Sequence, residues 1–344
     1  MAERLKAALV GVGSMGRGHL DNYVKLLKED SDIEIVALCD IDEKKFTNYK
    51  ADFNLGPVGE DGYDFDKFRL YTDLDEMLEK ETALDMVTIA LPTYLHAWGT
   101  IKCLNKGINV LCEKPMAPTY EDCMAMIEAA EKNGKFLMIG QCLRFATPYL
   151  TLKKYVDEKI LGECVAAHFF RGGGTPVWSY QNWLLDRSRG GGALFDQHIH
   201  DVDAVNFIFG RPDRVSTAAK TLFEKSYDTC STNYYYDNSD RPINTQNDWT
   251  LSGPYFYQDF RANFERGTIV RDRYGMNVYH KDGKVEAIEL PSENAYYNET
   301  VYFAECIRKG CAPDRVPARE TAETVRIALA EMASADAHGK IVNV

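Results

Sequence analysis

The first part of the chain alternates short apolar runs with segments of helical periodicity. Five apolar runs are predicted to be buried strands: Leu5–Val10, Ile33–Cys39, Leu84–Ala90, Ile108–Cys112 and Phe136–Ile139. Four segments between them carry apolar residues at helical spacing: Ser14–Lys28, Asp73–Lys80, Tyr94–Lys106 and Tyr120–Asn133. Strands that alternate with helices in this way are typical of α/β proteins, so residues 1–141 are predicted to form a doubly wound parallel sheet.

The pattern changes after residue 141. Helices are predicted near Tyr149–Lys159 and 193–209, around a strand at Cys164–Phe170. Aromatic-rich alternating runs follow at Arg214–Ala219, Thr229–Tyr236, Tyr255–Glu265, Thr268–Asp272 and Val278–His280. Two helices, Asn294–Gly310 and Ala318–Ala337, end the chain. Residues 142–344 are therefore predicted to form an α+β domain with an open, mostly antiparallel sheet, one face of which is solvated or covered by a partner.

Gly11, Gly13 and Gly16 follow the first predicted strand and open the first helix. In that context Gly11 allows a tight turn, Gly13 allows close approach of a pyrophosphate, and Gly16 allows close packing of helix on strand. The helix N-terminus adds free N–H groups and partial positive charge. Asp40 ends the second strand and favours a hydrogen bond to a free ribose 2′-OH, hence NAD over NADP. Alternatively Asp40 caps the next helix, although Asp42 is better placed to do so.

Lys114 follows the fourth strand, within the sequence Glu113-Lys114-Pro115. Ligands of open parallel sheets bind outside the carboxyl ends of the strands, so Lys114 is predicted to face the nucleotide crevice and to polarise a substrate hydroxyl or carbonyl. Glu113 is predicted to pair with a cation or to position Lys114. The alternative for Lys114 is a solvated surface lysine.

A glycine run at 190–192 precedes a second group of candidate residues. Asp196 and His200 are spaced i and i+4, so a helix would place them on one face, where a carboxylate can orient an imidazole that acts as a base. His198 would lie on a different face, which disfavours the alternative of a metal site built from Asp196, His198 and His200. A purely structural polar face is a further alternative.

Other residues remain open at the sequence level. His96 is predicted to be either a cofactor-side residue or a helix cap, and His19 is predicted to lie on a helix surface. Trp178, Tyr180 and Trp183 either line a pocket for a ring-shaped ligand or pack in the core. The irregular segment 53–68 is either a surface excursion or a flap near the adenosine end of the nucleotide site.

Composition narrows the class of protein. The net charge of −12 disfavours nucleic acid or an anionic membrane surface as partner. The nine cysteines are odd in number and show no Cys-x-x-Cys pair, which favours a reducing compartment over a disulfide framework. No secretory signal or apolar stretch of about 18 residues is evident, so a cytoplasmic protein without a membrane span is predicted.

Together these residues resemble the glucose-fructose oxidoreductase and inositol dehydrogenase family, known as Gfo/Idh/MocA. The resemblance rests on the 11–16 glycine turn, Asp40, the run from Leu91 to His96, Glu113-Lys114-Pro115, and Gly191-Gly192-Ala193-Leu194 with Asp196 and His200. It implies an N-terminal Rossmann domain and a C-terminal domain whose sheet often mediates dimers or tetramers. It also implies that Lys114, Asp196 and His200 form a catalytic triad beside the nicotinamide.

The motifs, the resemblance and, for Arg144 and Trp183, position along the chain together give the predicted site. The predicted cofactor-binding set is Gly11, Gly13, Ser14, Met15, Gly16, Asp40, Leu91, Pro92, Thr93, His96, Glu113 and Lys114. The predicted substrate-binding set is Lys114, Arg144, Trp183, Asp196, His198 and His200, and no metal ligand is predicted. His198 stands where many members carry glycine, which suggests either an extra polar group near the sugar or a subfamily-specific substrate.

The predicted function is hydride transfer between NAD and a secondary hydroxyl of a sugar, sugar derivative or cyclitol, with NADP less favoured as the cofactor. The alternative is a NAD-dependent enzyme that cleaves glycosides by transient oxidation and elimination. A non-enzymatic nucleotide sensor is a third hypothesis, disfavoured by the intact triad. A homodimer or homotetramer is predicted, while the sugar, the direction of the reaction and the subunit number stay open.

Overall fold

The structure is a computed structural model that describes residues 4–29, 31–48, 59, 62–222, 226–252, 256–291 and 294–344. The chain divides into two compact units. The first unit comprises Met1–Gly140 and Ala295–Ala322, and the second comprises Gln141–Asn294 and Glu323–Val344. A single boundary, after residue 141, is predicted from the sequence, whereas the chain passes between the two units three times.

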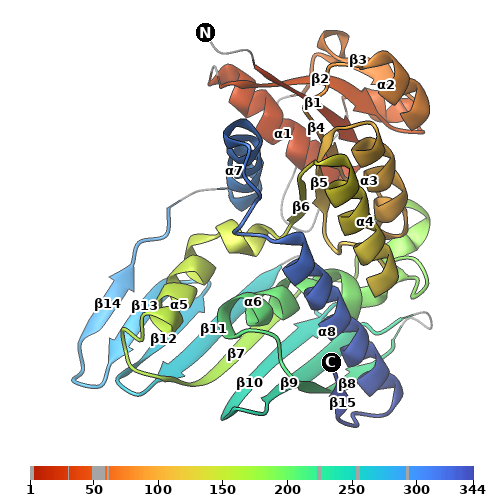
Figure 1. The fold of residues 1–344 in the computed structure, drawn as a ribbon. Coiled ribbons are helices and arrows are strands. Elements are labelled where there is room, and N and C mark those ends of the chain that lie inside the picture. Colours follow the sequence, from red (N-terminus) through yellow and green to blue (C-terminus); the bar gives the residue numbers. More distant parts are fainter. Residues whose placement is uncertain are drawn as a thin grey trace. The chain divides into compact units, whose positions relative to one another are not determined.

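The first unit is built on a six-stranded parallel sheet with the order β3-β2-β1-β4-β5-β6 (Figure 1). Its strands are β1 (Leu5–Val10), β2 (Ile33–Cys39), β3 (Arg69–Tyr71), β4 (Met86–Ile89), β5 (Asn109–Glu113) and β6 (Leu137–Gly140). Its α-helices are α1 (Ser14–Lys28), α2 (Leu74–Lys80), α3 (His96–Asn105), α4 (Tyr120–Asn133) and α7 (Ala295–Lys309). The strand order reverses between β1 and β4, which is the switch point where a doubly wound sheet binds its ligand.

The second unit contains a nine-stranded sheet with the order β14-β13-β12-β11-β7-β10-β9-β8-β15. Its strands are β7 (Cys164–Gly172), β8 (Arg214–Lys220), β9 (Thr229–Tyr236), β10 (Ser239–Asp248), β11 (Tyr257–Phe264), β12 (Gly267–Asp272), β13 (Gly275–His280), β14 (Val285–Ile288) and β15 (Val342–Asn343). The pairing is antiparallel except between β7 and β10. Figure 1 shows α5 (Thr147–Asp157) and α6 (Ile199–Phe209) against one face of this sheet.

The predicted fold class is confirmed: a doubly wound parallel sheet is joined to a unit with a mostly antiparallel sheet. The central strand β10 was not predicted, because its sequence is polar. Its inward residues Ile243, Thr245 and Asn247 are at most 1% exposed. Thr245 lies within hydrogen-bonding distance of Tyr234, at 2.9 Å, and of His198, at 3.2 Å. The core beneath α6 is therefore partly polar, and such a strand lacks an apolar pattern.

The predicted helix at 193–209 is two elements. Ala193–Gln197 forms a π-helical turn, closed by a hydrogen bond from the His198 N–H to the Ala193 carbonyl at 2.9 Å, and α6 follows. The predicted irregular segment 53–68 falls largely outside the described residues. Its described end includes a short 3-10 helix at Phe65–Lys67. Among the described residues, no helix combines the length and the apolarity that a bilayer crossing requires.

Candidate functional site

The glycine turn lies at the switch point of the first sheet, between β1 and α1. Gly11 has a φ of +91°, and a Cβ there would lie 2.5 Å from the Ala90 carbonyl oxygen. A Cβ on Gly16 would lie 1.9 Å from the Gly11 carbonyl oxygen. On Gly13, by contrast, a Cβ would meet no heavy atom of the described residues within 4 Å. Packing therefore requires the first two glycines, while Gly13 leaves space at the helix N-terminus that fits a pyrophosphate.

Asp40 follows β2 and faces the same turn. Its Oδ2 accepts a hydrogen bond from the Val12 N–H at 2.7 Å, and its Oδ1 accepts one from the Asp42 N–H at 3.0 Å. Asp42, rather than Asp40, caps the short 3-10 helix Glu43–Phe46 by accepting from the Lys44 N–H. The Asp40 carboxylate is half-buried and fixed in orientation, as a group that recognises a ribose hydroxyl needs to be.

His96 links the ends of β4 and β5. Its Nδ1 lies 2.7 Å from the Pro115 carbonyl oxygen, its Nε2 lies 2.8 Å from the Leu91 carbonyl oxygen, and the residue is 1% exposed. Burial lowers the pKa of His96, and the two carbonyl oxygens oppose that shift because they would accept from both nitrogens of an imidazolium. His96 thus tethers the turn that contains Lys114 and the cis Lys114–Pro115 peptide bond.

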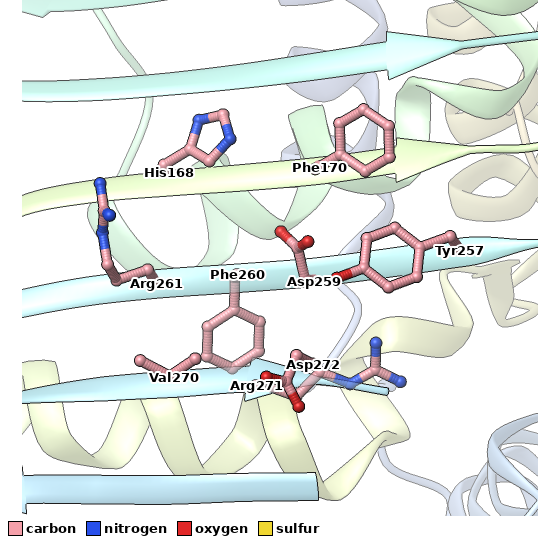
Figure 2. Close-up of a pocket in the computed structure, with 9 residues that line it drawn as sticks. All are labelled: His168, Phe170, Tyr257, Asp259, Phe260, Arg261, Val270, Arg271 and Asp272. Carbon is pink, nitrogen blue, oxygen red and sulfur yellow. The ribbon is translucent and has the colours of Figure 1, made fainter. Parts of the chain in front are cut away.

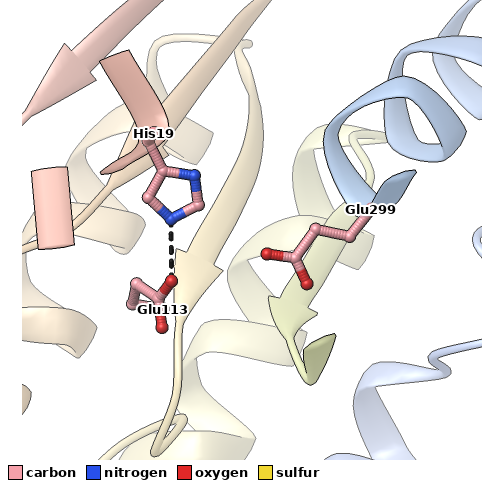
Figure 3. Close-up of side chains that lie close together, drawn as sticks. All are labelled: His19, Glu113 and Glu299. Carbon is pink, nitrogen blue, oxygen red and sulfur yellow. Dashed lines mark hydrogen bonds and ion pairs between the residues drawn. The ribbon is translucent and has the colours of Figure 1, made fainter. Parts of the chain in front are cut away.

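Glu113 precedes Lys114 at the end of β5 and is 4% exposed. Its Oε1 accepts a hydrogen bond from Nε2 of His19 at 2.7 Å (Figure 3). Its Oε2 accepts one from the Lys114 N–H at 3.0 Å. Burial alone would raise the pKa of Glu113, but the hydrogen bonds and charges of His19 and Lys114 together outweigh it and hold that pKa below its usual range. The prediction that His19 lies on a helix surface is wrong, since His19 is 1% exposed.

In the second unit, Asp196 belongs to the π-helical turn and His200 to the first turn of α6. The turn is wider than an α-turn, so their i, i+4 relation is not the one that a continuous α-helix would give. His200 is 9% exposed, and Asp196 is half-buried. π-Turns inside helices are frequent at functional sites, and none was predicted here.

Two buried ion pairs fix α6 just after His200. The Arg171 guanidinium donates to both carboxylate oxygens of Asp201, at 2.9 and 3.1 Å. Arg144 donates to both oxygens of Asp203, each at 2.8 Å, and both residues are at most 1% exposed. Burial would lower the pKa of Arg171, but Asp201 outweighs it and the pKa is raised. The sequence signal for these pairs is the presence of two aspartates inside an apolar-periodic helix, which requires buried partners.

Three residues predicted to bind substrate have partners inside the second unit. Arg144 pairs with Asp203, as described above. The His198 Nε2 lies 3.2 Å from Oε2 of Glu331, and neither side chain is exposed. Trp183 is half-buried and packs against a cluster formed by Leu184, Ala193 and Trp249, together with Trp178 and Leu185. Lys114, in the first unit, is half-buried.

A separate hollow of about 500 Å³ lies on the second sheet (Figure 2). Residues of β7, β11 and β12 line it: His168, Phe170, Tyr257, Asp259, Phe260, Arg261, Val270, Arg271 and Asp272. It contains none of the residues predicted to bind cofactor or substrate. Its lining combines aromatic rings with charges of both signs.

The switch-point glycine turn, the oriented Asp40 and the strand-end lysine define a Rossmann-type dinucleotide-binding protein. Residues 5–141 match the oxidoreductase family with an NAD-binding Rossmann fold, and residues 149–270 match the GFO/IDH/MocA C-terminal domain. The chain belongs to the Gfo/Idh/MocA oxidoreductase family. The predicted family and the predicted NAD-binding domain are therefore confirmed.

Named relatives share part of this sequence. The chain is 30% identical over 210 residues to a 2,7-anhydro-N-acetylneuraminate hydratase of Mediterraneibacter gnavus, covering 61% of this chain and 50% of the relative. It is 29% identical over 205 residues to an inositol 2-dehydrogenase of Salmonella typhimurium, covering 59% of this chain and 54% of the relative. The chain thus matches about half the length of these curated relatives.

The fold is shared more widely than the sequence. A levoglucosan dehydrogenase in complex with NADH and levoglucosan superposes with a TM-score of 0.83 at 20% identity, covering 99% of this chain and 100% of that chain. At this identity the likeness shows that both units have the architecture of that enzyme.

Proposed function

We propose that this protein is a NAD-dependent oxidoreductase that transfers a hydride between the nicotinamide and a secondary hydroxyl of a sugar, sugar derivative or cyclitol. The observation that carries the proposal is the position of Lys114 at the carboxyl end of a strand in the parallel sheet of the family's NAD-binding fold. It follows β5, the neighbour of β4, and β4 flanks the switch point at which the glycine turn lies.

NAD would supply the acceptor or donor of the hydride, while side chains of the protein handle the proton and the charge on oxygen. We propose that His200 takes the proton of the substrate hydroxyl, that Lys114 stabilises the developing alkoxide, and that Asp196 orients the site. The buried ion pairs of Asp201 and Asp203 support this assignment because they hold the backbone that carries His200.

The cofactor would be held mainly by backbone groups of the glycine turn, with Ser14 and Met15 opening α1. Asp40 would accept from the adenosine ribose, and Leu91, Pro92 and Thr93 would line the next strand end. His96 and Glu113 act in this proposal by shaping the turn of Lys114.

The names of the relatives support the proposed substrate class. Inositol and levoglucosan are polyhydroxylated rings, and the dehydrogenases named for them share this chain's family or fold. The substrate site would include Lys114, Arg144, Trp183, Asp196, His198 and His200. Arg144 pairs with Asp203, and His198 lies beside Glu331. Both residues would therefore affect substrate binding indirectly, by holding the walls of the site in place.

A second candidate is a NAD-dependent enzyme that cleaves a glycosidic or anhydro linkage by transient oxidation and elimination. The similarity to a 2,7-anhydro-N-acetylneuraminate hydratase favours it. Oxidation at one carbon acidifies the neighbouring C–H, elimination breaks the C–O bond, and return of the hydride leaves no net NADH.

We further propose a homo-oligomer formed through the second sheet and a cytoplasmic location. Val165, Tyr279 and Val285 on this sheet are between 43% and 57% exposed, which suits a covered face. All nine cysteines are free thiols and eight of them are buried, as in proteins of reducing compartments.

The test is NADH formation from NAD with pooled cyclitols, sugars and anhydrosugars, comparing the wild type with Lys114→Ala and Lys114→Arg. We expect turnover in the wild type and a loss of roughly 10²-fold or more in kcat for Lys114→Ala, with NAD still bound. NAD binding without NADH formation, combined with cleavage of an anhydro or glycosidic substrate, would favour the second candidate. Full activity of Lys114→Ala would overturn the assignment of Lys114.

A further inference from the structure

Three buried side chains of the first unit meet behind the turn that carries Lys114. His19 comes from α1, Glu113 from the end of β5, and Glu299 from α7 (Figure 3). One ring nitrogen of His19 and one carboxylate oxygen of each glutamate lie within 4.8 Å of one another. The Glu113 carboxylate accepts two hydrogen bonds. Its Oε1 accepts from Nε2 of His19, and its Oε2 accepts from the Lys114 N–H.

Glu299 is the unexplained member of this group. It is 0% exposed, and neither of its carboxylate oxygens has a hydrogen-bond partner among the described residues. The titratable groups that face it are His19 and Tyr23 on α1 and Glu113 on β5. On the β6 side stands Gly140, whose missing Cβ would lie 3.5 Å from a carboxylate oxygen of each glutamate. An ionised carboxylate in such a place would be strongly destabilising.

The geometry fits a hydrogen bond between His19 and Glu113, with Glu299 protonated beside it, better than a bound cation. Two ligand atoms on one cation at about 2.0–2.2 Å must stay roughly 3 Å apart, because the angle between them is about 90° or more. The His19 nitrogen and the Glu113 oxygen are 2.7 Å apart, which is the distance of a hydrogen bond between them. Burial, followed by the charge of Glu113, raises the pKa of Glu299 well above its usual value. With Glu299 protonated, Glu113 carries the one carboxylate charge of the trio, and His19 and the Lys114 N–H both donate to it.

We propose that His19, Glu113 and Glu299 form one electrostatically coupled cluster that fixes the backbone turn presenting Lys114, with His19 and Glu299 as positioning residues. This inference rests on the proposed function only for the role of Lys114. Glu299 keeps the proton, so Glu113 keeps the negative charge with which it accepts from His19 and from the Lys114 N–H. Ionisation of Glu299 would place two adjacent negative charges in the core and loosen that acceptor pair.

The first test measures the unfolding equilibrium of the full chain between pH 5 and pH 8 for the wild type and Glu299→Gln. When folding raises the pKa of a carboxyl group, the folded state loses stability as pH rises above the unfolded pKa of about 4.3. The unfolding equilibrium constant then increases tenfold per pH unit until the folded pKa is reached. The glutamine variant has the same shape and does not titrate. We expect the unfolding equilibrium constant of the wild type, divided by that of Glu299→Gln, to increase at least tenfold from pH 5 to pH 8. Glu305→Gln, on the exposed side of the same helix, should show no such trend.

A constant ratio between wild type and Glu299→Gln over this pH range would overturn the proposal. A stoichiometric divalent metal in the purified wild type, lost in Glu299→Gln, would also overturn it in favour of a cation site. Neither measurement requires a substrate, so the cluster can fail while the dehydrogenase stands, and the dehydrogenase can fail while the cluster stands.

The second test asks whether the cluster positions Lys114. We expect His19→Asn to raise amide hydrogen exchange in the peptide covering 112–117 by roughly tenfold or more, and Glu299→Gln to leave it near the wild-type rate. If turnover is found, His19→Asn should lower kcat while leaving the NAD dissociation constant within about twofold. Unchanged exchange in folded His19→Asn would show that the cluster does not hold the turn.

Discussion

Nε2 of His198 lies 3.2 Å from Oε2 of Glu331, and both side chains are fully buried in the second unit. The pair joins α6, whose N-terminal cap is His198, to α8 (Ala318–Asp336), which carries Glu331. The same ring nitrogen lies 3.2 Å from Oγ1 of Thr245 on β10. His198 thus connects three elements beneath the helix that presents His200.

Replacing His198 should therefore act first on stability. We expect His198→Ala to reduce the free energy of unfolding by about 1–3 kcal/mol, because Thr245 loses a buried hydrogen-bond partner and a cavity opens beside Glu331. Urea denaturation of the wild type, both single variants and His198→Ala/Glu331→Gln gives the coupling energy of the pair. Wild-type stability of His198→Ala together with a raised KM would instead mean that the imidazole contacts substrate.

Two glycines of the first turn should respond differently to the same substitution. Gly13→Ala should fold with nearly wild-type stability because its Cβ enters open space, yet it should weaken NAD binding by roughly tenfold or more by occupying the pyrophosphate site. Gly16→Ala would place its Cβ 1.9 Å from the Gly11 carbonyl oxygen, so it should destabilise the unit itself. Thermal unfolding and NAD titration of both variants check this, and unaltered NAD affinity in Gly13→Ala would contradict it.

Asp40 should determine the choice between NAD and NADP. Its carboxylate repels a 2′-phosphate and accepts from a free ribose hydroxyl, and hydrogen bonds to charged groups contribute about 1.5–3 kcal/mol. We expect Asp40→Ala to raise the dissociation constant for NAD by roughly 10- to 100-fold and to narrow the preference over NADP. Asp42→Ala, which removes the adjacent helix cap, is the matched control. Equal effects of the two variants on NAD would argue against ribose recognition by Asp40.

The contribution of Glu81 to the stability of the edge strand β3 should depend on pH. Glu81 accepts hydrogen bonds from Arg69, at 2.7 Å to its Oε2, and from the Tyr71 hydroxyl at 2.6 Å. The hydrogen bond from Arg69 holds the pKa of Glu81 below its usual range, although burial opposes it. The stabilisation is therefore present above the unfolded pKa and is lost as pH falls through the folded pKa.

We expect Glu81→Gln to cost about 1 kcal/mol at pH 7, a modest value because Arg69 is half exposed. The difference from the wild type should shrink as pH falls below the usual pKa of glutamate and should disappear below the lower pKa of the folded state. Denaturation curves between pH 3 and pH 7 measure it, with Glu76→Gln, from an exposed pair with Lys80, as the control. A difference that is constant with pH would contradict the assigned role of Glu81.

Apolar patterning predicted the first sheet well because its strands are buried on both faces and appear as continuous apolar runs. The exception is β3, whose three residues lie at an edge and include the exposed Arg69 and Leu70. In the second unit the pattern failed at β10, since Thr245 and Asn247 face a core that contains His198. Apolar periodicity also predicted a single helix at 193–209. A π-turn is defined by its hydrogen bonds and has no apolar repeat of its own by which the sequence could reveal it.

The motif residues themselves were identifiable from sequence because a strand, a turn and a helix in order make the glycine spacing specific. Their partners were not. Glu299 follows Glu113 by almost two hundred residues, and Arg171 meets Asp201 across two different elements. Such pairs depend on the tertiary arrangement, and without it a buried aspartate or histidine shows only that some partner must exist.

The return of α7 to the first unit has a consequence for how the chain can be dissected. The larger part of the second unit, Gln141–Asn294, is an insertion, because the polypeptide that leaves the first unit after Gly140 re-enters it at Ala295. A truncation after Gly140 would delete Glu299 together with the rest of α7. The side of β5 and β6 on which α7 packs would then be exposed. A minimal nucleotide-binding fragment should therefore be made as a spliced gene, in which a short linker joins the segment ending at Gly140 to the one beginning at Ala295.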